Sequence, residues 1–235
     1  LFMNHDGQLR VMIMAGGTGG HVFPALDVVR ELRKDNTSIS WLGTRSGIEA
    51  DVVPKHDIPL HFITIEGVRG RGLMALLKAP ILLLRSILQA LSILGKTQPQ
   101  VVVGMGGFAS APGALAAWLR RIPVIIHEQN SIAGRVNRFL ILFRKARAAI
   151  QGLPGSFSKL DRLMMRFSDD MRFLGNPIRK EILDIKRDSL KADQSKDLKV
   201  FIMGGSQGAR SINMSAPNAL AALKRTKNIK VVHDT

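Results

Sequence analysis

The sequence contains no cysteine and no tyrosine among its 235 residues, and aromatic residues make up only 5% of it. Without cysteine the chain can form no disulfide and perform no thiol chemistry, which fits a reducing compartment. Aromatic side chains are scarce, and no basic run is interleaved with them, which argues against a stacking surface for nucleic acid. We therefore expect no nucleic-acid partner.

Acidic residues are also scarce. The sequence has 18 aspartates and glutamates against 34 lysines and arginines, so its formal net charge is +16. This excess favours an anionic partner, and with nucleic acid disfavoured the candidates are a phosphorylated ligand and an anionic membrane surface. The stretch Leu1–Arg10 contains no apolar core segment, so no secretory signal is expected there.

Glycine, by contrast, is abundant and clustered. VMIMAGGTGGH (Val11–His21) begins with four apolar residues typical of a buried strand, continues into a glycine turn, and is followed by apolar residues at helical spacing. Such a unit suits phosphate binding, because glycine lets backbone N–H groups approach an anion and the helix N-terminus adds positive potential. The same order recurs at Val101–Ser110 and Val200–Arg210. Three such units predict an α/β fold with parallel strands.

The chain is predicted to form one complete α/β domain followed by the beginning of another. Further strands are expected at Ile39–Leu42, His61–Glu66, Val101–Val103, Pro123–Glu128 and Ala148–Gln151. The segment FLGNP (Phe173–Pro177) indicates a hinge, because proline disfavours helix in the residue before it. We therefore place the N-terminal domain at residues 1–175, and the linker with the incomplete second domain at residues 176–235.

The most apolar segment is Leu73–Leu94, which we expect to be a helix with apolar residues on more than one face. It is not a clean membrane span, because Lys78, Pro80 and Arg85 interrupt it. One interpretation is a buried crossover helix. The other is a helix that packs on the sheet with one face and dips into lipid headgroups with the other, where Lys78 and Arg85 share a face.

Three polar residues stand where an α/β fold places its ligands. His21 lies where the first glycine turn meets its helix, and the helix N-terminus favours the neutral imidazole, which can accept a proton from a hydroxyl. A plain structural contact is the alternative for His21. Asn130 follows a strand end, where it can cap the loop or bind a sugar. Arg179 follows the hinge, and can be solvated or hold a diphosphate.

A dinucleotide site is an alternative interpretation of the glycine turns. The first turn fails the G-x-G-x-x-G pattern at its last position, but the second fits a variant of it with Gly104, Gly106 and Ala109. Glu128 then stands near the separation expected for a ribose-binding acid. Against this interpretation, Pro112 interrupts the expected start of the helix. A dinucleotide-dependent oxidoreductase therefore stays as a distant alternative.

Seven segments, in order from about Leu9 to His233, together resemble the MurG family of peptidoglycan glycosyltransferases. They are GGTGGHVFPAL (Gly16–Leu26), WLGT (Trp41–Thr44), DVVPKH (Asp51–His56), GMGGF (Gly104–Phe108), IPVIIHEQN (Ile122–Asn130), GNPIR (Gly175–Arg179) and GGSQGAR (Gly204–Arg210). The resemblance implies a GT-B fold, in which two Rossmann-like domains face a cleft. It also implies inverting transfer of N-acetylglucosamine from UDP-N-acetylglucosamine to undecaprenyl-diphosphate-linked muramyl-pentapeptide (lipid I to lipid II), with no metal and no cofactor.

The resemblance further implies roles for individual residues. His21 matches the family's candidate catalytic histidine. The residues that match contacts to UDP-N-acetylglucosamine are Thr18, Gly19, Gly20, Asn130, Arg179 and Ser206. The loop beside the acceptor diphosphate contains Gly104, Gly106 and Gly107. The implied location is peripheral, at the cytoplasmic face of the bacterial inner membrane, with Lys78 and Arg85 at the anionic surface.

The family extends well beyond the position that matches Thr235. The further part holds the uridine pocket and an acidic residue that binds the donor ribose. We therefore expect the 235-residue chain not to transfer sugar by itself. The alternative function is a truncated, non-catalytic, membrane-associated module that binds the lipid-linked acceptor.

Overall fold

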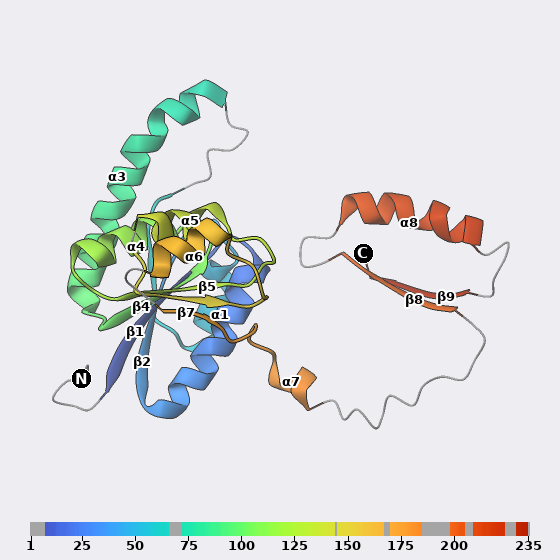
Figure 1. Cartoon of the computed structure of the whole chain (residues 1–235), viewed down its shortest axis with the longest axis horizontal. Helices are drawn as coiled ribbons and strands as arrows, with labels where there is room; N and C mark the ends of the chain where they lie inside the picture. The colour runs from blue at the N-terminus through green and yellow to red at the C-terminus, as the bar shows by residue number, and fades with distance from the viewer. Residues whose placement is uncertain are drawn as a thin grey trace. The chain divides into compact units, whose positions relative to one another are not determined.

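The computed structural model describes residues 8–65, 72–143, 145–166, 170–184, 198–204, 209–223 and 229–234. The chain forms two compact units, Leu1–Arg179 and Lys180–Thr235 (Figure 1). The division follows Arg179, whereas the sequence placed the domain boundary after Gly175. The hinge segment therefore belongs to the first unit.

A parallel sheet of seven strands forms the centre of the first unit, in the order β3-β2-β1-β4-β5-β6-β7. The strands are β1 (Leu9–Ala15), β2 (Thr37–Gly43), β3 (Leu60–Phe62), β4 (Val101–Gly106), β5 (Val124–Glu128), β6 (Ala148–Gln151) and β7 (Asp170–Phe173). The order reverses between β1 and β4, which is where open α/β sheets bind their ligands. The predicted parallel α/β architecture is confirmed.

Strand β3 is shorter than the strand expected at His61–Glu66. The N–H of Ile63 still donates to the carbonyl of Gly43 in β2, at 3.0 Å. The N–H of Thr64 instead donates to the side-chain oxygen of Gln89, at 2.7 Å. The alternating pattern of the sequence continues past Phe62, but the backbone leaves the sheet there because a helix side chain takes over its hydrogen bond.

The helices of the first unit cover both faces of the sheet (Figure 1). They are α1 (Gly19–Leu32), α2 (Glu49–Val52), α3 (Gly72–Thr97), α4 (Ser110–Leu119), α5 (Arg135–Leu142) and α6 (Lys159–Arg166). Alternate residues of β1 supply two cores: Val11 and Ile13 pack with α1, while Met12 and Met14 pack with α3 and α4. Burial on both faces explains why β1 is a continuous apolar run.

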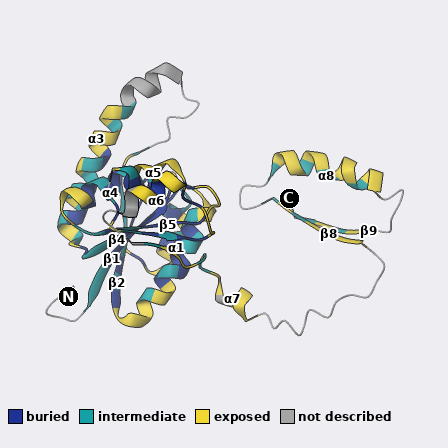
Figure 2. Cartoon of the chain, viewed as in Figure 1, coloured by how far each residue is buried: buried dark blue, intermediate teal, exposed yellow. Residues whose placement is uncertain are grey.

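Helix α3 is longer at both ends than the predicted helix at Leu73–Leu94. One face is buried, with Ser86, Ala90 and Leu94 no more than 1% exposed. The other face is open to solvent, and Figure 2 shows this side of α3 as largely exposed. Ile81 and Leu88 on that face are 70% and 57% exposed. The interpretation of α3 as a fully buried crossover helix is therefore wrong.

By length and composition alone, Ala79–Thr97 is long and apolar enough to cross a membrane. This differs from the prediction that Lys78, Pro80 and Arg85 interrupt the segment too much for a clean membrane span. In the folded unit, however, one face of this helix lies in the core beside α4. The observed packing therefore fits a helix on the surface of the unit better than an isolated span.

The second unit is a single strand–helix–strand element. Its parts are α7 (Lys180–Leu183), β8 (Leu198–Met203), α8 (Arg210–Leu223) and β9 (Ile229–Asp234), and β8 pairs with β9 in parallel. This confirms the order of strand, turn and helix predicted around the third glycine turn. Apolar side chains of the unit are largely exposed, as Phe201 at 65% and Met214 at 68% illustrate. Ser206, in the glycine turn itself, lies outside the described residues.

Candidate functional site

The first two glycine turns meet at the point where the strand order of the sheet reverses. The turn after β1 contains Gly16 and Gly17, and the turn after the neighbouring strand β4 contains Gly107. Gly107 has a φ of +87°, and a Cβ at this position would overlap the backbone carbonyl of Gly16. The two turns therefore touch backbone to backbone, which only glycine permits.

His21 lies between these two turns. It stands in the first turn of α1, and a Cβ on Gly106 would lie 2.6 Å from its Nδ1 atom. Gly106 also has a positive φ, of +100°. The Nδ1 atom of His21 is buried and has no hydrogen-bond partner in the described part of the chain. The structure thus brings His21, Gly106 and Gly107 together.

Gly104 does not belong to this junction. It was predicted to lie in the same loop as Gly106 and Gly107, but it lies within β4, paired with Met14 and Ile126. A Cβ on Gly104 would make only ordinary contacts, the nearest at 3.7 Å. The loop interpretation of Gly104 is therefore wrong, because the strand continues to Gly106.

Glu49 holds the first glycine turn in place, and the sequence analysis missed it. Its carboxylate is fully buried and accepts hydrogen bonds from the N–H of Gly17 at 2.9 Å and from the N–H and hydroxyl of Thr44 at 2.8 and 2.7 Å. A Cβ on Gly43 would lie 2.6 Å from the Glu49 side chain, and one on Gly47 would overlap its carboxylate. The glycines around Glu49 thus make room for a buried acid.

The bond to Glu49 also determines which N–H groups the first turn can offer a ligand. Gly17 is already paired, and the N–H of His21 donates to the Thr18 carbonyl at 3.1 Å. Within the described residues, the N–H groups of Thr18, Gly19 and Gly20 have no protein acceptor. Three such donors at a helix N-terminus suit an anion.

Asn130 is tethered to a second buried acid, Glu128, at the end of β5. Glu128 is 1% exposed and accepts from the backbone N–H of Asn130 at 3.0 Å and from its side-chain amide at 2.9 Å. It also accepts from the N–H of Gly134 and the amide of Asn137. The Asn130 side chain, which is exposed, is therefore held in a defined orientation at the carboxyl edge of the sheet.

These contacts weaken the dinucleotide alternative. It needed Glu128 to face a ribose, but this carboxylate is buried and accepts four hydrogen bonds, two from Asn130 and one each from Gly134 and Asn137. The objection drawn from Pro112 is also wrong, because α4 starts at Ser110 and proline is tolerated in the first turn of a helix. The buried acid, and not the proline, is the structural reason to set that reading aside.

The hinge segment is fastened to the ends of β5 and β6. The Nε2 atom of His127 lies 3.2 Å from the carbonyl of Gly175, and the Asn176 amide donates to the carbonyl of Gln129 at 3.1 Å. The N–H groups of Leu174 and Gly175 both donate to the carbonyl of Gln151. Gly175 has a φ of +88°, which permits the turn.

Arg179 follows the hinge segment and contacts α1, the helix that contains His21. Its guanidinium carbon lies 5.2 Å from the ring centroid of Phe23 in α1. A cation at this distance from an aromatic ring is attracted to it. Of the residues implied for the donor sugar, the first unit thus gathers Thr18, Gly19, Gly20 and Arg179 around α1, with Asn130 at the same edge of the sheet.

Burial lowers the pKa of His127 below its ordinary value of 6.5, although the Gly175 carbonyl and Glu128 oppose the shift. The unfolded chain therefore binds a proton at this residue more readily than the folded chain. The stabilising contribution is complete above pH 6.5 and is lost as the pH falls through the lower pKa of the folded state.

We expect His127→Gln to reduce the loss of stability between pH 7.5 and about pH 5. The measurement is the free energy of unfolding in urea at several pH values. His56→Gln is the control, since His56 is exposed. Equal pH dependence in parent and His127→Gln would show that this histidine does not contribute.

The described residues contain no group of three or more histidines, aspartates or glutamates that could hold a metal ion. The arrangement is instead one of backbone donors, a histidine, an amide and a cation at the ligand-binding edge of a parallel sheet. Such groups can bind a diphosphate and a sugar, and they can accept a proton.

The chain belongs to glycosyltransferase family 28, because residues 11–149 match the N-terminal domain of that family. It is 46% identical over 222 residues to the UDP-N-acetylglucosamine–N-acetylmuramyl-(pentapeptide) pyrophosphoryl-undecaprenol N-acetylglucosamine transferase of Pectobacterium carotovorum subsp. carotovorum (strain PC1). It is 44% identical over the same length to the protein of that name from Vibrio cholerae. The alignments cover 94% of this chain but 57% and 58% of these relatives. The chain thus spans less than two thirds of the length of the curated relatives it matches.

Solved structures agree with this assignment. The crystal structure of Acinetobacter baumannii MurG matches with a TM-score of 0.74 and 34% identity, over 96% of this chain and 60% of that one. The Streptomyces glycosyltransferase SsfS6, at 16% identity and a TM-score of 0.54, shares the fold alone. The predicted fold class is confirmed: an α/β fold of the GT-B type, with a Rossmann-like N-terminal domain and the start of a second.

Proposed function

We propose that this chain forms the acceptor side of an N-acetylglucosaminyltransferase. The reaction is the one named for its relatives: N-acetylglucosamine moves from UDP-N-acetylglucosamine to muramyl-pentapeptide linked through a diphosphate to undecaprenol. The observation that supports the proposal most directly is the junction of the two glycine turns, where His21 packs on Gly106. Three backbone N–H groups beside His21 have no protein acceptor within the described residues.

His21 is the general base in this proposal. The 4-hydroxyl of the muramyl sugar attacks the anomeric carbon of N-acetylglucosamine, and the bond from that carbon to the diphosphate of UDP breaks with inversion. The hydroxyl proton moves to the imidazole. Because Nδ1 faces Gly106, Nε2 on the other side of the ring is the nitrogen that takes the proton.

The remaining groups bind the charged and polar parts of the substrates. The N–H groups of Thr18–Gly20 and the cation of Arg179 stabilise negative charge on the departing diphosphate. Asn130 donates through its nitrogen to Glu128, so its oxygen is left to accept from a sugar hydroxyl. The end of β4 at Gly106 and the turn at Gly107 face the acceptor diphosphate.

The test is a transfer assay with a chimaera in which this chain continues into the remaining length of the Pectobacterium relative. We expect the chimaera to transfer labelled N-acetylglucosamine to the lipid-linked acceptor, and the 235-residue chain alone to transfer none. Asn130→Ala in the chimaera should affect both donor binding and turnover. An inactive but folded chimaera, beside an active Pectobacterium enzyme, would contradict the proposal.

We propose in addition that the protein binds peripherally to an anionic membrane, at the cytoplasmic face of the inner membrane. Ile81, Leu84 and Leu88 form an exposed apolar stripe on α3, and the exposed Arg85 lies within it. An apolar surface with cations suits an anionic leaflet. The side chain of Lys78, which the sequence placed on the same face, is not among the described ones.

The end of α4 also carries exposed apolar side chains. Trp118 and Leu119 are 44% and 55% exposed. The Nε atom of Arg120 donates to the carbonyl of Leu91 in α3 at 2.9 Å, so the two helices are joined here. The ammonium of Lys145 lies 3.0 Å from the ring centroid of Trp118. Arg120 therefore lies beside α3 and Lys145 lies beside Trp118, and cations together with tryptophan are common in helices at membrane surfaces.

We expect Lys78→Glu with Arg85→Glu to weaken binding to anionic vesicles strongly, because each cation near such a surface contributes about 1 kcal/mol. The measurement is co-sedimentation at low and high salt, with circular dichroism to verify folding. The matched control is Lys34→Glu with Lys55→Glu, which makes the same charge change at exposed residues away from α3. If both double variants sediment alike, α3 is not the contact surface.

A further inference from the structure

A small polar hollow opens beside the first glycine turn, at the carboxyl ends of β2 and β3. Its volume is about 280 Å³, and α3 closes one side of it. The lining residues are Thr44, Arg45, Ser46, Phe62 and Gln89, with the segment Ile63–Ile65. Neither the proposed base nor the groups proposed for the diphosphate lie in this hollow, so the proposed mechanism leaves it without a role.

Arg45 is the charged group of the hollow. Its guanidinium carbon lies 4.6 Å from the ring centroid of Phe62, so the cation is supported by an aromatic ring. The residue is exposed, and it makes no ion pair with any acid that the structure describes. A guanidinium held in this way can form a bidentate pair with a carboxylate.

The rest of the hollow suits a single carboxylate on an aliphatic residue. Gln89 is fixed by two bonds to Thr64, from the backbone N–H at 2.7 Å and to the hydroxyl at 3.3 Å. Ser46 is exposed and supplies a further hydroxyl, while Phe62 and Ile65 provide apolar walls. One cation with hydroxyls and apolar walls matches an amino-acid carboxylate better than a diphosphate, which calls for more donors.

The hollow and the glycine turn are held by the same buried acid. Thr44, which lines the hollow, donates to Oε1 of Glu49, while Gly17 of the turn donates to Oε2. Both oxygens belong to one carboxylate, so the hollow and the turn are neighbours in a rigid arrangement. A ligand bound at the turn can therefore extend into the hollow.

We propose that this hollow binds a carboxylate of the acceptor's peptide through Arg45. The inference rests on the proposed function, in which the acceptor is a muramyl-pentapeptide. Arg45 is a binding residue in this scheme, and it anchors the peptide while the sugar hydroxyl lies near His21.

The experiment measures binding by calorimetry, with the 235-residue chain and two probes. One probe is muramyl-pentapeptide linked through diphosphate to a short prenyl chain, and the other is the same compound with its peptide carboxyls converted to amides. Arg45→Gln should weaken binding of the first probe about tenfold, the usual effect of a charge-assisted hydrogen bond. The amidated probe should bind parent and variant equally.

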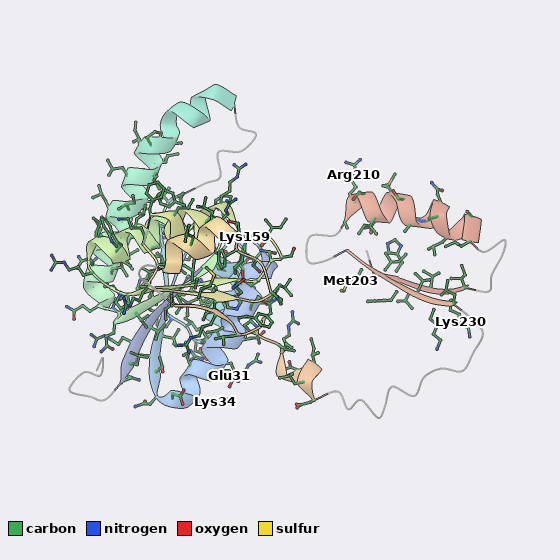
Figure 3. All side chains as sticks on the ribbon, in the orientation of Figure 1. Glu31, Lys34, Lys159, Met203, Arg210 and Lys230 are labelled. Atoms are coloured by element: carbon green, nitrogen blue, oxygen red, sulfur yellow. The ribbon has the colours of Figure 1, made fainter. Side chains whose placement is uncertain are left out.

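Lys34→Gln is the matched control, because it removes the same charge from an exposed residue just after the C-terminal end of α1, where it pairs with Glu31 (Figure 3). It should change neither affinity. Equal weakening of both probes by Arg45→Gln, or no weakening, would overturn the carboxylate subsite. If the parent chain binds neither probe while circular dichroism shows it folded, the acceptor site itself fails, which is a separate result.

Discussion

Gly107→Ala is expected to lower the free energy of unfolding by about 3 kcal/mol or more and to abolish binding of the acceptor. Two costs add at this position. An alanine with a φ of +87° is strained, and its Cβ would overlap the carbonyl of Gly16. Because the obstacle is backbone and not the end of a flexible side chain, the two glycine turns must move apart.

Two other glycines of the site separate these costs. Gly17 has a φ of +90° but no atom within 4 Å of a new Cβ, so Gly17→Ala measures the backbone strain alone. Gly20 lies in the first turn of α1 with only the Thr18 hydroxyl nearby, at 3.8 Å, so Gly20→Ala should be neutral or slightly stabilising.

The measurement is urea unfolding of the three variants, followed by calorimetry with the short-chain acceptor. The expected order of destabilisation is Gly107→Ala, then Gly17→Ala, then Gly20→Ala. If Gly107→Ala lowers the free energy of unfolding no more than Gly17→Ala does, the turns after β1 and β4 are not in backbone contact. The geometry proposed for the site is then wrong.

The parallel fold could be predicted because its signals are local. The apolar run of β1, the glycine turn and the spacing of α1 each occupy one short stretch of chain. A strand that is buried on both faces is a continuous apolar run, which can be recognised without knowing the neighbouring strands. The junction of the two turns was not predicted, because it requires β1 and β4 to be neighbours in the sheet and the order of the strands leaves no local signal in the sequence.

The buried acids could not be predicted in the same way. Glu49 resembles any solvated acid at the start of a short helix, and only its three donors and the glycines around it reveal its role. Glu128 ends a strand, and for that reason it fits the ribose ligand of the dinucleotide alternative. Sequence does not reveal whether such a carboxylate faces a ligand or accepts N–H groups from its own loop, as this one does.

Gly104 was misplaced for a related reason. A glycine inside a strand and a glycine in the following turn have the same appearance in a sequence. The pairing of β1 with β4 shifts between Met14 and Ala15, so that Ala15 pairs with Gly106 and the strand extends past Gly104. Tertiary pairing, and not local preference, determines where the turn begins.

His21→Ala is expected to lower kcat of the chimaera about a hundredfold or more, with little change in the KM for the acceptor. A general base acts only in the transition state, so its removal affects turnover more than binding. The ring also packs against Gly106, so truncation leaves a gap between the two glycine turns. His21→Gln, which keeps more of the volume, separates loss of the base from loss of packing.

If His21 is the base, both His21 variants lose most of the parent rate. His56→Ala, at an exposed histidine outside the site, controls for the loss of an imidazole in general. If His21→Gln retains more than about a third of the parent kcat, the histidine supports the junction of the turns by packing, and the proton of the acceptor hydroxyl must go elsewhere.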